Sequence, residues 1–168
     1  MMSQKAFMMT LALVVGAVLG LSPNPLVASA KHHSSNQKIF AQQLMDQAIS
    51  KHPEVTQIEL AVPSPRGCST IAASDPKGIG EKCDRDELEA LRSGKPFVEK
   101  ERAGFDVTLP LHDVAGKLIG TVGMDFKPQP GQQELIVVEQ ATKIVQELEV
   151  QISSQAKLFE PAPSAAIK

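Results

Sequence analysis

The sequence predicts an α+β domain in which one antiparallel five-stranded sheet is flanked by an N-terminal helix, a short middle helix and a long C-terminal helix. Two observations predict the sheet: alternating apolar and polar residues flank a turn at residues 113–117, and a second alternating pair of runs lies earlier in the chain. A third observation predicts the two outer helices, because a stretch near each end of the domain carries apolar residues at steps of three and four.

The first helix is expected over residues 39–52, where Pro53 stops the pattern. A hairpin follows it. Residues 57–62 form one strand, the turn 63–67 contains two prolines and a glycine, and residues 68–74 form the other strand. The apolar residues of the helix are Ile39, Phe40, Leu44, Met45, Ala48 and Ile49.

The middle of the chain is expected to hold a loop, a short helix and a brief strand. Residues 75–80 form the loop. Asp84 is placed to cap a helix that ends near Arg92, with Gly94 as the stop signal. A strand over residues 97–101 then leads into the central hairpin.

The central hairpin has one apolar face, and Gly116 supplies its turn with a residue that tolerates positive φ. After residues 128–131 the chain reads as one long amphipathic helix, with Phe159 as its last ordered contact. Pro161 and Pro163 then predict a disordered tail over residues 161–168. The apolar face comprises Phe105, Val107, Leu109 and Leu111 in the first strand and Leu118, Gly120, Val122, Met124 and Phe126 in the second; the helix repeats Val138, Ala141, Val145, Leu148, Ile152 and Gln155.

The N-terminus predicts export. Lys5 precedes an apolar run over residues 6–21, and an A-x-A site ends at Ala30, so residues 1–30 read as a signal peptide. The run is shorter than the roughly 20 apolar residues that span a bilayer, although an uncleaved anchor is the alternative. Cleavage would leave no membrane span and a mobile polar segment over residues 31–37, and would put the domain, residues 38–160, in the periplasm or outside the cell.

Composition excludes several classes of partner. Without Lys5 the chain has 16 basic and 19 acidic residues, a formal charge of −3, which supports neither a nucleic-acid surface nor a membrane-binding stripe. Trp and Tyr are absent and there are only six Phe, so aromatic platforms for bases or sugars are scarce. We therefore expect a small polar ligand, for instance a carboxylate, and no nucleic acid.

Cys68 and Cys83 are expected to form a disulfide, because their number is even and an exported protein lives where disulfides persist. The bridge would close a loop containing residues 78–80 and stabilise the fold by ~3 kcal/mol. Free thiols and a thiol redox enzyme are the alternatives. The spacing of the cysteines is far from C-x-x-C, which disfavours redox catalysis.

Three pieces of the sequence resemble Cache domains, the extracytoplasmic relatives of PAS domains: His52-Pro53-Glu54, Gly78-Ile79-Gly80 and the hairpin pattern L-P-L-H-D-x-x-G-K-x-I-G over residues 109–120. The resemblance covers residues 38–160. It implies a PAS-like fold whose central hairpin forms the middle of a ligand-binding sheet, and a sensor function. Amino-acid-binding Cache domains carry Tyr and Trp in their ligand pattern, and this chain departs from that pattern.

The polar face of the central hairpin is the candidate binding site. Asp106, Thr108 and His112 share one face of the first strand, and Thr121 and Asp125 share one face of the second. Such residues can hydrogen-bond a small polar ligand, but a solvent-facing strand carries them too. Basic residues could add a site for a carboxylate group, as in organic-acid-binding relatives; they are Arg66, Lys100 and Arg102.

No catalytic, metal-binding or cofactor-binding motif is present: the chain lacks H-E-x-x-H, G-x-S-x-G and a phosphate-binding glycine loop. We therefore expect binding and not turnover, with no cofactor and no metal. The expected protein is an exported ligand-binding sensor domain without its own output domain, which would signal through a membrane receptor or another protein. The alternative is an exported structural or interaction domain that keeps the fold without a functional pocket.

Overall fold

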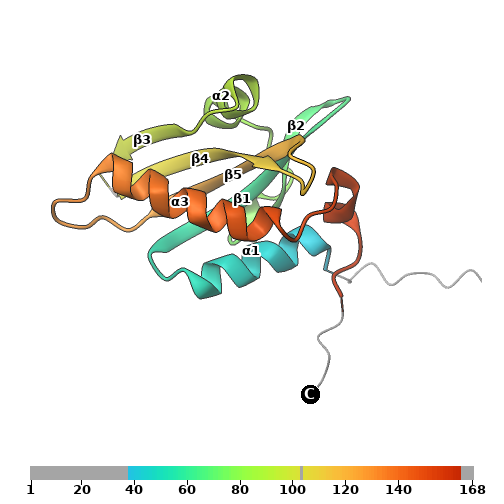
Figure 1. Cartoon of the computed structure of the whole chain (residues 1–168), viewed down its shortest axis with the longest axis horizontal. Helices are drawn as coiled ribbons and strands as arrows, with labels where there is room; N and C mark the ends of the chain where they lie inside the picture. The colour runs from blue at the N-terminus through green and yellow to red at the C-terminus, as the bar shows by residue number, and fades with distance from the viewer. Residues whose placement is uncertain (1–37, 103, 164–168) are drawn as a thin grey trace, which may run out of the picture. The chain divides into compact units, whose positions relative to one another are not determined.

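The sheet is five-stranded and antiparallel, as the sequence predicts (Figure 1). This computed structural model describes residues 38–102 and 104–163. The strands follow the order β2-β1-β5-β4-β3, so the first and last strands of the chain pair at the centre of the sheet. Their bounds are β1 Val55–Ser64, β2 Gly67–Ala73, β3 Phe97–Glu101, β4 Gly104–His112 and β5 Leu118–Phe126.

Three α-helices flank the sheet: α1 (Phe40–Lys51), α2 (Arg85–Ser93) and α3 (Glu134–Glu149). Figure 1 shows α1 and α3 side by side on one face of the sheet, and α2 contacts β4 and β5 from the other face. The predicted α+β class and the order of its elements are confirmed.

The hydrophobic core lies between the sheet and the pair α1 and α3. Strand alternation turns one face of the central part of β1, β4 and β5 toward these helices, and the apolar side chains on that part of the face are buried. Burial of this apolar surface is the main stabilising term of the fold. The core residues of the three strands are Ile58, Leu60 and Val62, then Val107, Leu109 and Leu111, then Val122, Met124 and Phe126.

Local signals in the sequence define α2 at both ends. Asp84 is its N-cap and forms a capping box with Glu87. The side chain of each residue accepts a hydrogen bond from the backbone N–H of the other. Gly94 follows the helix with φ 66°, a left-handed conformation that glycine adopts readily. The predicted cap and stop are therefore confirmed.

The C-terminal helix is shorter than predicted. α3 ends at Glu149, and residues Gln155–Phe159 form a separate short 3₁₀ helix, η2. Between them the carbonyl of Ile152 accepts a hydrogen bond from the N–H of Val114, at 2.9 Å, so it is not used in a continuing α-helix. The apolar pattern continues past Glu149 because Ile152 and Leu158 are still buried in the core.

The two ends of the described chain meet. Ile39 forms a β-bridge with Pro161, and the N–H of Ala162 donates to the carbonyl of Lys38 at 2.8 Å. Residues 161 and 162, which the sequence places in the predicted disordered tail, thus pair with residues 38 and 39, and the extent of that tail stays a prediction. The predicted signal peptide, the segment 31–37 and residues 164–168 lie outside the described residues. Within the described part, no helix has the length and apolar character needed to cross a bilayer.

Gly120 gives the first testable prediction, because a Cβ there would lie 2.4 Å from the carbonyl oxygen of Ala61 and 3.2 Å from Cγ1 of Val62. Gly120→Ala is expected to lower the free energy of unfolding by about 1–3 kcal/mol, the usual cost of overpacking. Urea denaturation measures it. Gly78→Ala is the matched control, since its Cβ would have ordinary contacts at 3.5 and 3.8 Å. Equal stability of the two variants would contradict the close approach of β1 and β5.

Candidate ligand-binding site

The face of the sheet turned toward α2 is polar at its centre. Asp106 on β4 lies opposite Asp125 on β5, and Thr108 lies opposite Gly123. On the other side of β5, Glu59 of β1 is the partner of Gly123. Because partners across a sheet share a face, these residues from three neighbouring strands form one floor.

A cavity of about 290 Å³ lies between this floor, the first turn of α2 and the segment that joins β2 to α2. The joining segment contains a short 3₁₀ helix, η1 (Pro76–Gly78). Eight carboxyl side chains line the cavity, whereas Lys77 is the one basic residue among the described lining residues. The acidic residues are Glu59, Asp75, Glu81, Asp84, Asp86, Glu87, Asp106 and Asp125.

Two glycines make room for the carboxyl group of Glu59. A Cβ on Gly123 would lie 3.3 Å from Cγ and 3.4 Å from Oε1 of Glu59, so this side chain lies directly over the glycine in the floor. A Cβ on Gly78 would lie 3.5 Å from Oε2 of the same carboxyl. The carboxyl group of Glu59 therefore lies between Gly123 in the floor and Gly78 in the wall of the cavity.

The capping box brings three acidic residues to the cavity. The N–H of Asp84 donates to Oε2 of Glu87 at 2.8 Å, and Oδ1 of Asp84 accepts from the N–H of Asp86 at 2.9 Å. Asp86 also accepts a hydrogen bond from Nε of Arg85 at 3.2 Å. The start of α2 is thus fixed over the floor by its own local hydrogen bonds.

The carboxyl groups of Glu87 and Asp84 titrate abnormally. Glu87 is only 6% exposed. Burial, together with hydrogen bonding to the side chains of Asp84 and Glu59, raises the pKa of Glu87 to about 8, against the lowering effect of the Asp84 N–H. The pKa of Asp84 is lowered, mainly by its hydrogen bond with the Glu87 side chain. At neutral pH Glu87 therefore holds a proton while Asp84 is ionised.

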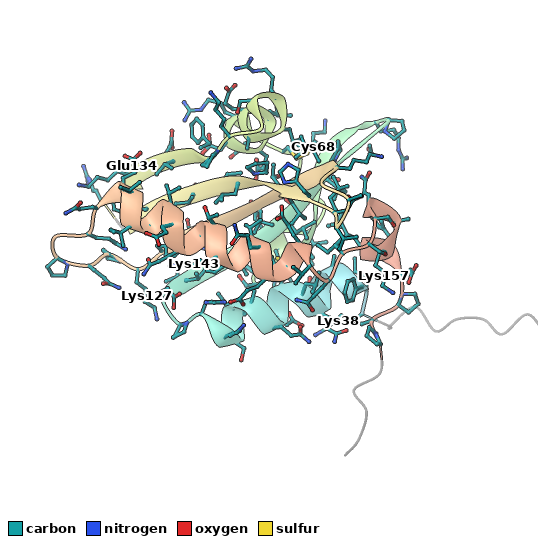
Figure 2. All side chains as sticks on the ribbon, viewed as in Figure 1. Lys38, Cys68, Lys127, Glu134, Lys143 and Lys157 are labelled. Atoms are coloured by element: carbon teal, nitrogen blue, oxygen red, sulfur yellow. A yellow bond between two sulfur atoms is a disulfide. The ribbon has the colours of Figure 1, made fainter. Side chains whose placement is uncertain are left out.

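The predicted disulfide is confirmed, and it fixes the wall of the cavity. Cys68, labelled in Figure 2 near the start of β2, is bonded to Cys83, with Cα atoms 5.3 Å apart. Backbone hydrogen bonds join the same two stretches, among them Thr70 N–H to the carbonyl of Glu81 at 3.0 Å. The disulfide and these hydrogen bonds thereby hold the segment between β2 and α2 against the sheet. Four charged lining residues belong to this segment: Asp75, Lys77, Glu81 and Asp84.

Three residues of the predicted binding face line the cavity, namely Asp106, Thr108 and Asp125. Thr108 is buried in its floor, and Asp125 lies in the floor beside it. Thr121 faces the same side of β5 but is completely buried outside the cavity, opposite Ala61 and Pro110. A binding role for any of these residues stays a prediction.

The four other candidates lie elsewhere, and one of them, Lys100, is exposed on β3 over the ring of Phe105. The pairing of β4 with β5 skips Ile119, so His112 lies opposite Leu118 and turns toward α3, where its Nδ1 is 2.9 Å from Oε1 of Glu149. Arg66 is exposed in the turn between β1 and β2, and Arg102 is exposed in the turn between β3 and β4. None of these four residues lines the cavity.

Sequence reasoning missed Glu59 and Glu87, the two acidic residues at the centre of the site. Both had a local signal. Glu59 alternates with apolar neighbours in β1, and Glu87 stands three residues after the cap Asp84, the spacing of a capping box. The pairing of β1 with β5, which brings Glu59 beside the central hairpin of β4 and β5, could not be predicted from the sequence.

Of three comparisons with known proteins, only the comparison with solved structures found similar proteins. No family model matches the chain, and no curated protein matches it. A candidate GAF sensor protein from Burkholderia vietnamiensis has a similar structure, with a TM-score of 0.50 and 11% identity over 70% of this chain and 76% of that chain. The chain therefore has a GAF/PAS-like fold, and nothing found assigns it to the Cache domains in particular.

Two further solved structures are similar at lower scores. The GAF domain of a two-component sensor histidine kinase from Bacillus halodurans has a TM-score of 0.49 and 14% identity, over 66% of this chain and 91% of that chain. The inducer-binding domain of the transcription factor PobR from Acinetobacter, in complex with 3-hydroxybenzoic acid, has a TM-score of 0.45 and 10% identity, over 68% of this chain and 95% of that chain.

Proposed function

We propose that this protein is an exported, sensor-type domain of the Cache-like kind that binds a small molecule in the cavity between the sheet and α2. The cavity on the polar face of the sheet is the observation that carries the proposal. A domain that had lost its pocket would have this face filled or flat, so the cavity favours binding over the alternative of a purely structural or interaction domain.

The size of the cavity suits a small ligand. Ligand sites begin at roughly 300 Å³, so a cavity of about 290 Å³ lies at the small end of their range. The acidic lining disfavours the carboxylate ligand expected from the sequence, because like charges repel and Lys77 alone offers a positive charge in the lining.

The proposed mechanism is binding without turnover. The start of α2, fixed by its capping box, and the disulfide-bonded segment before it form the part of the site that faces the sheet. A ligand that contacts both can bias their positions, and a membrane receptor or another protein partner would detect the change. Export rests on the leader in the sequence and is supported by the disulfide.

A thermal-shift screen of the purified full chain tests the proposal, using amines, carboxylates, sugars and metal salts. One chemical class is expected to raise the melting temperature saturably, since a ligand at 100 times its Kd adds about 2.7 kcal/mol of stability. Gly78→Leu is expected to abolish the shift, because a Cβ at Gly78 would already contact the lining residues Glu59 and Ala73, at 3.5 and 3.8 Å, and the rest of the leucine side chain would take up space in the cavity.

Gln146→Leu is the matched control, since it adds the same side chain at an exposed position of α3. It should keep the full thermal shift. If no class of compound shifts the melting temperature, the protein is better described as an interaction domain. An equal shift in Gly78→Leu would place the ligand outside this cavity.

A further inference from the structure

We propose that the ligand is a small organic cation with two or more amino groups, such as a short diamine or polyamine, held between the carboxyl groups of the floor and those at the start of α2. This inference rests on the proposed function and names its ligand class. The cavity defines the site, and the chemistry of its lining defines the ligand.

The acidic residues surround the cavity on several sides. Glu59, Asp106 and Asp125 come from three neighbouring strands of the floor, and Asp84 and Glu87 come from α2. Asp106 and Asp125 lie directly opposite each other, about 5 Å apart, and Glu59 lies diagonally across from Asp125, about 7–8 Å away. These separations resemble that of the two nitrogens in a short diamine, so one ligand can contact several carboxyl groups at once.

The environment of Glu87 fits a cavity that is short of positive charge. Its side chain is more than nine-tenths buried, accepts a hydrogen bond from the N–H of Asp84 and lines the cavity beside Glu59 and Asp84. A buried carboxylate is costly unless a cation or several hydrogen bonds stabilise it. Arg85, the nearest basic residue of α2, is directed to Asp86 and to Glu99 on β3, and Glu87 keeps a proton instead. An ammonium group in the cavity would supply the missing charge.

Other classes of ligand fit less well. No three His, Cys, Asp or Glu side chains among the described residues are arranged to hold a metal ion, and a cavity of about 290 Å³ is much larger than one ion needs. Quaternary ammonium groups are usually bound by aromatic rings, and none of the described lining residues is aromatic. Primary and secondary amines instead donate N–H hydrogen bonds, which carboxylates accept at short distances.

Isothermal titration calorimetry of the full chain tests this ligand class with putrescine, spermidine, tetramethylammonium, calcium, magnesium and succinate. We expect saturable one-to-one binding of putrescine or spermidine and no binding of tetramethylammonium or succinate. Glu59→Gln keeps the shape of the side chain and removes its charge, and it is expected to weaken amine binding at least tenfold. Glu139→Gln, which removes an exposed carboxylate paired with Lys143 on α3, should leave the affinity unchanged.

Glu81→Gln is a second variant that tests the site without touching the floor. Glu81 is exposed at the rim of the cavity, and its structural hydrogen bonds are made by its backbone. Its replacement is expected to weaken amine binding about threefold while the melting temperature is unchanged. The inference therefore stays testable if Glu59→Gln does not fold.

The remaining outcomes separate the inference from the proposed function. Equal weakening by Glu81→Gln and Glu139→Gln would indicate non-specific attraction to an acidic protein and would overturn the inference. If only succinate, a sugar or calcium binds, and Gly78→Leu abolishes that binding, the inference of an amine ligand is overturned while the sensor proposal stands. The absence of binding by every compound in both experiments would overturn the two proposals together.

Discussion

The free energy of unfolding is expected to fall as the pH rises from about 4.5 to about 8, and Glu87→Gln is expected to remove most of this fall. The usual pKa of a Glu side chain is 4.5, whereas burial, together with the side chains of Asp84 and Glu59, raises the pKa of Glu87 to about 8 in the folded protein. Between these two values the folded chain holds a proton that the unfolded chain has already released.

The sign of the effect follows from this difference in bound protons. Below pH 4.5 Glu87 is protonated in both states, so its stabilising effect is fully present. As the pH rises through about 8 the folded protein must also release the proton, and the effect is lost. The fall amounts to at most about 5 kcal/mol, since each pKa unit between the two states corresponds to about 1.4 kcal/mol. The lowered pKa of Asp84 acts in the opposite sense and at lower pH, below its usual 3.8.

Urea denaturation at intervals from pH 4.5 to pH 9 measures this dependence. Gln is the appropriate substitution because its oxygen can still accept the N–H of Asp84 and keep the capping box, while its amide donates as the protonated carboxyl does. Glu139→Gln is the control, since it removes an exposed carboxylate from α3. Parallel pH profiles for Glu87→Gln and the unmodified protein would show that Glu87 is ionised in the folded state at neutral pH.

The parts of the fold that follow from local chemistry could be predicted from the sequence. Asp84 and Gly94 mark the ends of α2 because a cap and a left-handed stop need particular side chains at particular positions. The two hairpins follow from apolar alternation. The end of α3 could not be predicted, because Ile152 remains apolar and buried while its carbonyl is taken by Val114, a residue far away in the sequence.

The candidate site could be predicted only in part, for a related reason. Alternation put Thr108 and Asp125 on one polar face, and that face does line the cavity. The same alternation did not place His112, because the register of β4 and β5 shifts at the end of the hairpin and the His112 side chain contacts Glu149 of α3. Glu59 and Glu87 meet only through the pairing of β1 with β5 and the packing of α2 on the sheet. Long-range contacts of this kind have no signature in a single sequence.

Replacing both cysteines with serine is expected to lower the free energy of unfolding by about 3 kcal/mol and to weaken ligand binding in the cavity. The disulfide joins residues 15 positions apart, and closing a loop of that length restricts the unfolded chain by about 3 kcal/mol in the chain-entropy model. The loop also contains cavity-lining residues, among them Asp75, Lys77 and Glu81. Once it is free to move, the wall must be ordered again each time a ligand binds, and that ordering reduces the affinity.

Urea denaturation and the thermal-shift assay measure the two effects on Cys68→Ser/Cys83→Ser. Dithiothreitol provides the matched control, because it should produce both losses in the unmodified protein by reducing the disulfide to two thiols and should change nothing in the double variant. Backbone hydrogen bonds such as Thr70 N–H to Glu81 also hold the segment. Unchanged stability would mean that these bonds are sufficient. A loss of stability without a loss of affinity would mean that the ligand is held by the floor and α2 alone, and that the disulfide-bonded wall does not contribute to the site.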